Sequence, residues 1–283
     1  MAGCLREADR HDVVACVRHP IERLVLEQAE ESVEVALRAL VDPADAMRVD
    51  WVLLCTKAQQ TPLTAPWLQR LCDSLTRVAV LQNGIDHAAR VGPLAGDAGV
   101  VPTIVYYNGE RLGVDRVRLR HVADHDLAVA DDAEGRALAQ LFDGTRLRVH
   151  LSGDFRTLAW RKLLINVVAN PITALTLQRQ AVFRRGDIEA LCVAILDEAV
   201  AVARADGAQL ADDESQRTIS TLLTYPPEAG TSMYFDRLAG RELEVEALTG
   251  AIVAAGRRLD IATPLNSALL TLLRAVSDAA RTG

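Results

Sequence analysis

Lysine is scarce in this sequence, which makes Lys57 and Lys162 the first candidates for proton chemistry. Of the 31 basic residues these are the only lysines, so the other 29 are arginines. A lysine ammonium can lose its proton at a perturbed pKa, whereas an arginine guanidinium stays protonated in proteins. Lysine is therefore expected to persist where a titratable cation is needed, and chance survival is the alternative for either residue.

Lys162 begins a polar stripe in an otherwise apolar helical pattern. Asn166 and Asn170 follow at intervals of four residues, which places all three side chains on one helix face. The stripe either lines a cavity or forms a ladder of hydrogen bonds between helices, because an unpaired buried polar group costs about 1–3 kcal/mol. Pro171 cannot donate a backbone N–H to Val167, so the helix is expected to kink or break beside Asn170.

A second group of polar residues follows later in the chain. Thr231 or Ser232 could cap a helix, and Asp236 in its early turns then has a structural role. Glu244 is expected near the start of a helix beginning at Glu242, where acidic residues usually complement the helix dipole. Spacing alone selects none of these residues for function.

The elements that must position these residues differ between the two halves of the chain. In the first half, short apolar runs alternate with helical patterns, which predicts parallel strands covered on both faces. Arg18, Lys57 and Asn83 each follow or end one run, at the edge where open α/β sheets bind ligands. An arginine after the first strand suits a 2′-phosphate, as in NADP, and a solvated strand end is the alternative. The runs are residues 13–17, 51–56 and 77–84.

The second half consists of long helical patterns with few strand signals, starting at about residue 153. The change of hydrophobic period from strand-like to helical predicts a domain boundary near residues 152–154. The chain is therefore expected to form an α/β domain followed by a helical one.

Composition excludes several classes of function. With 50% hydrophobic and 24% charged residues the chain can bury a core, and its net charge of −7 provides no broad basic surface for nucleic acid. No apolar run is long enough for a membrane helix, and the N-terminus lacks the pattern of a signal peptide. The five scattered cysteines indicate neither a metal site nor disulfides, so a cytoplasmic protein is expected.

The chain resembles the 2-dehydropantoate 2-reductase, or ketopantoate reductase, family over nearly its whole length. The resemblance is carried by W-R-K-x(3)-N-x(3)-N-P from Trp160, S-M-x(2)-D from Ser232, and a glutamate twelve residues after that serine. The segments L-L-C-T-K-A and L-Q-N-G add to it. The family resemblance implies an NADP-binding, Rossmann-type parallel-sheet domain over residues 1–152 and an all-α substrate and catalytic domain over residues 153–283.

The resemblance also implies an activity, the NADPH-dependent reduction of 2-dehydropantoate to pantoate on the way to pantothenate and coenzyme A. By motif position, Lys162 would donate a proton to the developing alkoxide, and Glu244 would orient the substrate and the active-site groups. The substrate, a small 2-oxo acid, would be bound by Asn166, Asn170 and Ser232, and NADPH by Arg18, Lys57 and Asn83. No metal is implied, and a homodimer is a candidate assembly.

This sequence departs from the family pattern in two places. It contains no G-x-G-x-x-G loop, and residues 1–6 resemble the middle of the helix that follows this loop, so the sheet is expected to lack its first strand. Ala229 stands where some members have an asparagine. These departures motivate two alternatives, a paralogous reductase of another 2-oxo acid and a truncated, non-catalytic relic.

Overall fold

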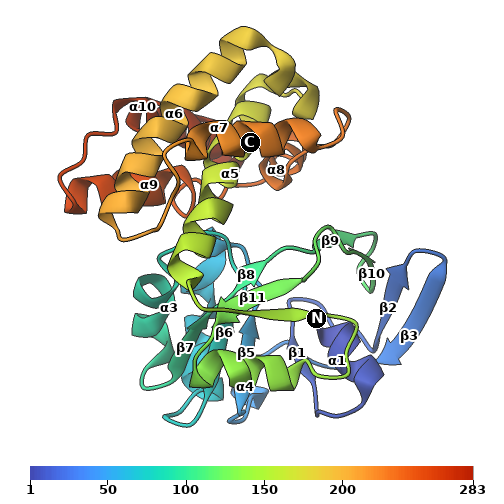
Figure 1. The fold of residues 1–283 in the computed structure, drawn as a ribbon. Coiled ribbons are helices and arrows are strands. Elements are labelled where there is room, and N and C mark those ends of the chain that lie inside the picture. The colour runs from blue at the N-terminus through green and yellow to red at the C-terminus, as the bar shows by residue number, and fades with distance from the viewer. Residues whose placement is uncertain (283) are drawn as a thin grey trace. The chain divides into compact units, whose positions relative to one another are not determined.

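The computed structural model describes residues 1–282, and the chain divides into two compact units (Figure 1). The first unit contains the strands and the second is built mainly from helices. Two short segments that follow strands in the sequence, Lys57–Gln59 and Asn83–Asp86, belong to the helical unit. The first unit comprises Met1–Thr56, Gln60–Gln82 and His87–Phe155, and the rest of the second is Arg156–Gly283.

The predicted apolar runs form parallel strands in the first unit, which confirms the α/β interpretation. Three of these strands pair in the order β5-β6-β7, and β1 pairs with β4. No ladder joins β1 to β5 in the part of the chain that the structure describes. The strands are β1 (Val14–Cys16), β4 (Arg38–Leu40), β5 (Trp51–Leu54), β6 (Arg77–Val80) and β7 (Gly99–Pro102).

Two further sheets complete the strands of this unit. One has the order β3-β2-β10-β9, in which β2 and β3 form an antiparallel hairpin that the apolar pattern does not predict. The polar residues Glu31, Ser32 and Glu34 divide β3, which leaves this strand no apolar run longer than two residues. The other sheet has the order β12-β11-β8. The strands are β2 (Arg23–Gln28), β3 (Glu31–Ala36), β8 (Ile104–Val105), β9 (Asn108–Arg111), β10 (Arg116–Arg120), β11 (Leu127–Ala130) and β12 (Val149–Ser152).

Short helices pack against these strands. Asp132 caps α4 by accepting a hydrogen bond from Gly135 N at 2.8 Å. A Cβ atom at Gly135 would overlap the carbonyl oxygen of Ala130, so glycine allows α4 to approach β11 closely. The helices are α1 (Ala2–Ala8), α2 (Ala65–Leu71), α3 (His87–Ala95) and α4 (Ala133–Leu141), with 3-10 turns at Pro43–Asp45 and Ala58–Thr64.

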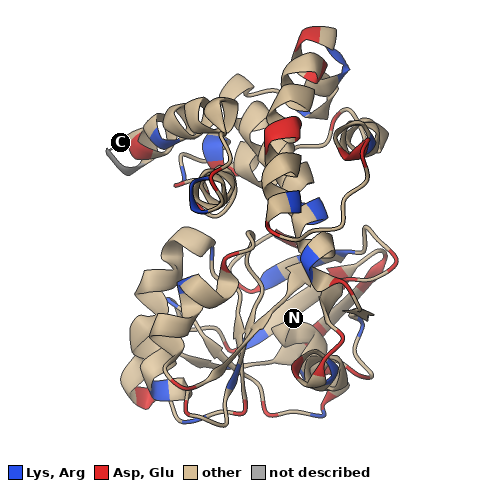
Figure 2. Ribbon diagram, turned by 60° about the vertical axis from the view of Figure 1, so that its left-hand side comes forward, with Lys and Arg blue, Asp and Glu red and all other residues tan. Residues whose placement is uncertain are grey.

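The second unit is helical, as the resemblance implies. Its core surrounds α5, whose Trp160, Leu164 and Val168 are almost completely buried. Blue and red segments are scattered over the ribbons in Figure 2, so charges of both signs are interspersed in this view. Among the residues described, no helix is long and apolar enough to span a membrane. The helices are α5 (Phe155–Thr176), α6 (Gly186–Ala205), α7 (Glu214–Thr224), α8 (Ser232–Leu238), α9 (Thr249–Arg258) and α10 (Pro264–Thr282), with a 3-10 turn at Gln180–Arg184.

The expected break at Pro171 is wrong, because α5 continues through this residue to Thr176. Pro171 and its neighbours on the helix are buried on all sides. Thr173 also donates a side-chain hydrogen bond to Ala169 O at 2.7 Å. Packing of the surrounding helices therefore holds the helix intact despite the missing N–H donor.

The expected helix start near Glu242 is also wrong. Residues 242–248 form an irregular loop, and α9 begins at Thr249. Leu243 N donates to Ser277 Oγ at 3.0 Å, and Glu244 is 5% exposed. The glutamate is turned into the unit instead of accompanying a helix N-terminus, because its carboxylate has specific partners there.

Candidate active site

The polar stripe predicted on α5 is present and hydrogen-bonded. Asn170 is 4% exposed and donates from Nδ2 to Asn166 Oδ1 at 3.3 Å. Lys162 lies two turns before Asn170 on the same helix and is half-buried. Burial lowers the pKa of Lys162 from its ordinary value. The stripe therefore combines a lysine that gives up its proton more readily than usual with two ordered amides.

Ser232 joins this stripe from α8. Its Oγ donates to Asn170 Oδ1 at 3.2 Å, and Met233 N donates to the same oxygen at 3.2 Å. The capping prediction is confirmed for Thr231, whose Oγ1 accepts from Tyr234 N at 3.1 Å. The start of α8 is thus fixed by its own cap, which leaves Ser232 to orient Asn170.

The stripe continues to Asn83 and from there to Glu244. Asn166 Nδ2 donates to Asn83 Oδ1 at 3.5 Å, and Asn83 Nδ2 donates to Glu244 Oε2 at 3.1 Å. These contacts, with those of Asn170 and Ser232, form one chain of hydrogen bonds, here called the amide ladder. Every donor in the amide ladder points toward Glu244, so the carboxylate at its end sets the direction of the whole chain.

Glu244 connects the amide ladder to Lys57. Its Oε1 accepts from Ala58 N at 3.1 Å, and its Oε2 accepts from Lys57 Nζ at 3.0 Å. With Asn83 this gives a nearly buried carboxylate three donors, one of them charged. A buried carboxylate requires this degree of compensation, since an unpaired buried charge is strongly unfavourable.

A second carboxylate, that of Asp236, contacts Lys57, and the sequence did not identify it as part of the site. Lys57 Nζ lies 2.9 Å from Asp236 Oδ2, and the other oxygen of Asp236 accepts from Arg241 Nε at 2.8 Å. Burial alone disfavours the charged form of Lys57, but Glu244 and Asp236 outweigh it and raise its pKa. The presence of Asp236 in the S-M-x(2)-D motif was the available signal, yet its early place in a helix favoured a structural role.

Arg18 belongs to the first unit and is exposed just after β1. The structure therefore brings together six of the eight predicted site residues by hydrogen bonds and places Lys162 on the same helix as two of them. The six are Lys57, Asn83, Asn166, Asn170, Ser232 and Glu244.

This arrangement suits chemistry in which negative charge develops on an oxygen. An ammonium with a lowered pKa can stabilise such an oxygen and give it a proton, and ordered amide and hydroxyl groups can hold a polar substrate. Within the described residues no cluster of His, Cys, Asp and Glu is arranged to hold a metal ion.

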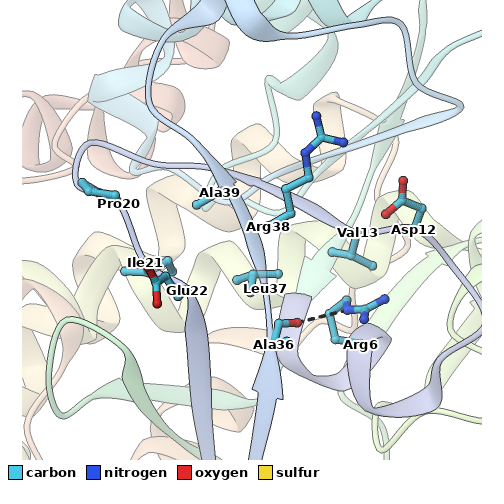
Figure 3. Close-up of a pocket in the computed structure, with 10 residues that line it drawn as sticks. All are labelled: Arg6, Asp12, Val13, Pro20, Ile21, Glu22, Ala36, Leu37, Arg38 and Ala39. Carbon is cyan, nitrogen blue, oxygen red and sulfur yellow. Dashed lines mark hydrogen bonds between the residues drawn. The ribbon is translucent and has the colours of Figure 1, made fainter.

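A separate pocket in the first unit has a volume of about 480 Å³ (Figure 3). Asp12 precedes β1 and Arg38 begins β4, so the pocket lies at the amino ends of these parallel strands. Arg6 is bonded to Ala36 O at 3.2 Å within it. Parallel sheets bind ligands at the opposite, carboxyl edge, so the pocket is not part of the candidate site.

Comparison with protein families matches both parts of the chain. Residues 1–132 match "Ketopantoate reductase PanE/ApbA", and residues 154–277 match "Ketopantoate reductase PanE/ApbA C terminal".

Individual relatives show the same similarity. A 2-dehydropantoate 2-reductase from Caulobacter vibrioides is 35% identical over 278 residues, covering 98% of this chain and 94% of the relative. One from Mycobacterium tuberculosis is 41% identical over 230 residues, covering 81% of this chain and 77% of the relative. The structure of a dimeric ketopantoate reductase from Staphylococcus aureus superposes with a TM-score of 0.86 at 26% identity, covering 99% of this chain and 94% of that one.

Proposed function

The chain belongs to the ketopantoate reductase family, and on this premise we propose that it reduces 2-dehydropantoate to pantoate with NADPH, a step toward pantothenate. The observation that carries the proposal is the amide ladder beside a lysine of lowered pKa on α5. The relatives from Caulobacter vibrioides and Mycobacterium tuberculosis, both named for this reaction, support the choice of substrate.

Lys162 acts as the general acid in this proposal. Reduction of the C2 ketone turns its oxygen into an alkoxide, and an ammonium stabilises this charge as it grows. The same group then gives the alkoxide a proton, which an arginine would retain. Burial lowers the pKa of Lys162 and so favours the release of this proton.

The amide ladder binds the substrate. Asn166, Asn170 and Ser232 offer amide and hydroxyl groups to a small, polar 2-oxo acid. Glu244 orients them, because the hydrogen bonds of all three point along the ladder toward its carboxylate. A pre-ordered set of donors reduces the entropy lost when the substrate is held for reaction.

The residues present fit part of the implied dinucleotide. The exposed guanidinium of Arg18 after β1 suits the 2′-phosphate of NADPH. Lys57 uses two of its three donors on carboxylates, which leaves one for the cofactor, and Asn83 is proposed as its neighbour in that contact. The sequence has no G-x-G-x-x-G loop for the pyrophosphate. When bound, NADPH supplies the hydride.

We further propose that residues 1–152 bind the cofactor and residues 153–283 carry the substrate and catalytic groups. The dimeric state named for the Staphylococcus aureus structure supports a homodimer, which light scattering on the purified chain would test.

The decisive experiment follows NADPH oxidation by the purified chain with 2-dehydropantoate, with NADH and a panel of bulky 2-oxo acids alongside. We expect a clear preference for NADPH, and Arg18→Ala should raise the KM for NADPH about 10-fold or more while leaving that for NADH nearly unchanged. Because Ala229 offers no side-chain donor, similar rates with several 2-oxo acids would instead favour a paralogous reductase. A folded chain that neither binds NADPH nor turns over substrate would support the alternative that the protein is a non-catalytic relic.

A further inference from the structure

Helix capping does not explain why Asp236 is buried. Thr231 already caps α8, and Asp236 lies in the second turn of this seven-residue helix. Its side chain is nevertheless 7% exposed, and both carboxylate oxygens are bonded to cations. A buried acid with two ionic partners needs a reason beyond helix formation, since burying charge is costly.

The chain after α8 turns back to provide one of these cations. Gly240 has a φ of 61°, a left-handed conformation that glycine adopts readily. Arg241 N then donates to Asp236 O at 2.9 Å, while its Nε donates to Asp236 Oδ1 at 2.8 Å. The arginine is thus tied to Asp236 by backbone and side chain together, which fixes the carboxylate.

The other oxygen of Asp236 faces Lys57. Lys57 Nζ lies between Asp236 Oδ2 at 2.9 Å and Glu244 Oε2 at 3.0 Å. The two carboxylates are 7% and 5% exposed, whereas Lys57 is 38% exposed. Two nearly buried carboxylates repel each other unless a cation separates them, and with Arg241 the group contains two acids and two bases.

We propose that Asp236, held by Arg241, is a positioning residue that fixes Lys57 against Glu244 and thereby orders the amide ladder. Asp236 needs no contact with substrate for this role. Its effect passes through Lys57 to Glu244 and then through Asn83 to the substrate-binding amides. The kinetic consequence rests on the proposed function, whereas the effect on Lys57 does not.

The scarcity of lysine gives a direct test. Protein labelled with ¹³C or ¹⁵N in its lysine side chains has signals from Lys57 and Lys162 alone, and Lys57→Arg assigns them. In Asp236→Asn we expect the Lys57 signal to titrate at lower pH than in the wild type, because one of its two carboxylates is neutral. The Lys162 signal should move little.

Glu214→Gln is the matched control. Glu214 is also a nearly buried acid in a helix of the same unit, and it pairs with Arg161 at 2.9 Å outside the amide ladder. Both substitutions neutralise a buried acid and should lower thermal stability. Only Asp236→Asn should shift the titration of the Lys57 signal. Only this variant should also raise the KM for 2-dehydropantoate and lower kcat/KM, the latter by up to about 10²-fold.

Two results would overturn the proposal. One is an unchanged Lys57 titration in Asp236→Asn. The other is a kinetic loss in Asp236→Asn no larger than that in Glu214→Gln. If the wild type does not reduce 2-dehydropantoate, the proposed function fails, and the Lys57 titration still decides whether Asp236 positions this lysine.

Discussion

The surroundings of Lys57 and Lys162 shift the pKa of the lysine ammonium group in opposite directions. Around Lys57, two carboxylates at 2.9 and 3.0 Å outweigh burial and raise the pKa. Around Lys162, burial dominates and lowers the pKa. The pKa shifts therefore favour the protonated form of Lys57 and the release of a proton from Lys162, in line with the proposed role of Lys162.

This difference shows that residue type alone does not assign a role. All other basic residues of the chain are arginines, so the sequence indicates both lysines as candidate functional residues. We assign the acid–base role in the proposed reaction to Lys162 because its surroundings disfavour its charge.

Lys162→Ala should have the largest effect. We expect kcat for 2-dehydropantoate to fall by about 10²–10⁴-fold, because the proposed general acid is lost. The fold should remain, since the substitution also removes the cost of burying a cation. Steady-state kinetics with circular dichroism checks both expectations, and a kcat near that of the wild type would mean that Lys162 is not the acid.

Glu244→Gln should affect activity and stability together. We expect kcat/KM to fall by about 10²-fold, because the carboxylate that directs the amide ladder is lost. Stability should drop by about 2 kcal/mol, less than for a fully buried pair because Lys57 is 38% exposed.

Glu246→Gln is the control for this variant in urea denaturation and kinetics. Glu246 pairs with Arg274, and both side chains are more than half exposed. Loss of this ion pair should lower the free energy of unfolding by less than about 0.5 kcal/mol and leave turnover unchanged. Equal effects of the two substitutions would remove the distinction between Glu244 and an ordinary surface acid.

The pH dependence should follow Lys162 and not Lys57. Its lowered pKa means that the ammonium is lost at lower pH than the ordinary lysine value of 10.5. We therefore expect kcat/KM to fall on the alkaline side with a midpoint below that value, and about tenfold per pH unit beyond it. Lys57 keeps its proton through this range. A profile that is flat up to the ordinary lysine value would contradict the assignment.

Ser232→Ala should have the smallest effect. Asn170 Oδ1 loses one donor but keeps Met233 N, so we expect a stability loss of about 0.5–1 kcal/mol and a KM increase of a few fold. Thr231→Ala removes the helix cap and should cost about 1 kcal/mol. Thermal denaturation compares the stability of the two variants, and an unchanged KM in Ser232→Ala would argue against the proposed contact of Ser232 with substrate.

Elements with strong local periodicity were predictable from the sequence. The runs at residues 13–17, 51–56 and 77–84 predicted parallel strands, and the spacing of Lys162, Asn166 and Asn170 predicted one helix face. These predictions succeeded because strand and helix periods are local properties of a few neighbouring residues. The motifs likewise identified the family before any geometry was known.

The contacts of those side chains depend on the tertiary structure. Packing around α5 overrode Pro171, and partners from distant segments drew Glu244 out of its predicted helix. Asp236 and Arg241 became part of the site through Lys57, which is 179 residues away from Asp236 in sequence. Hydrogen bonds and ion pairs of this kind depend on where the chain folds back, which no local period encodes.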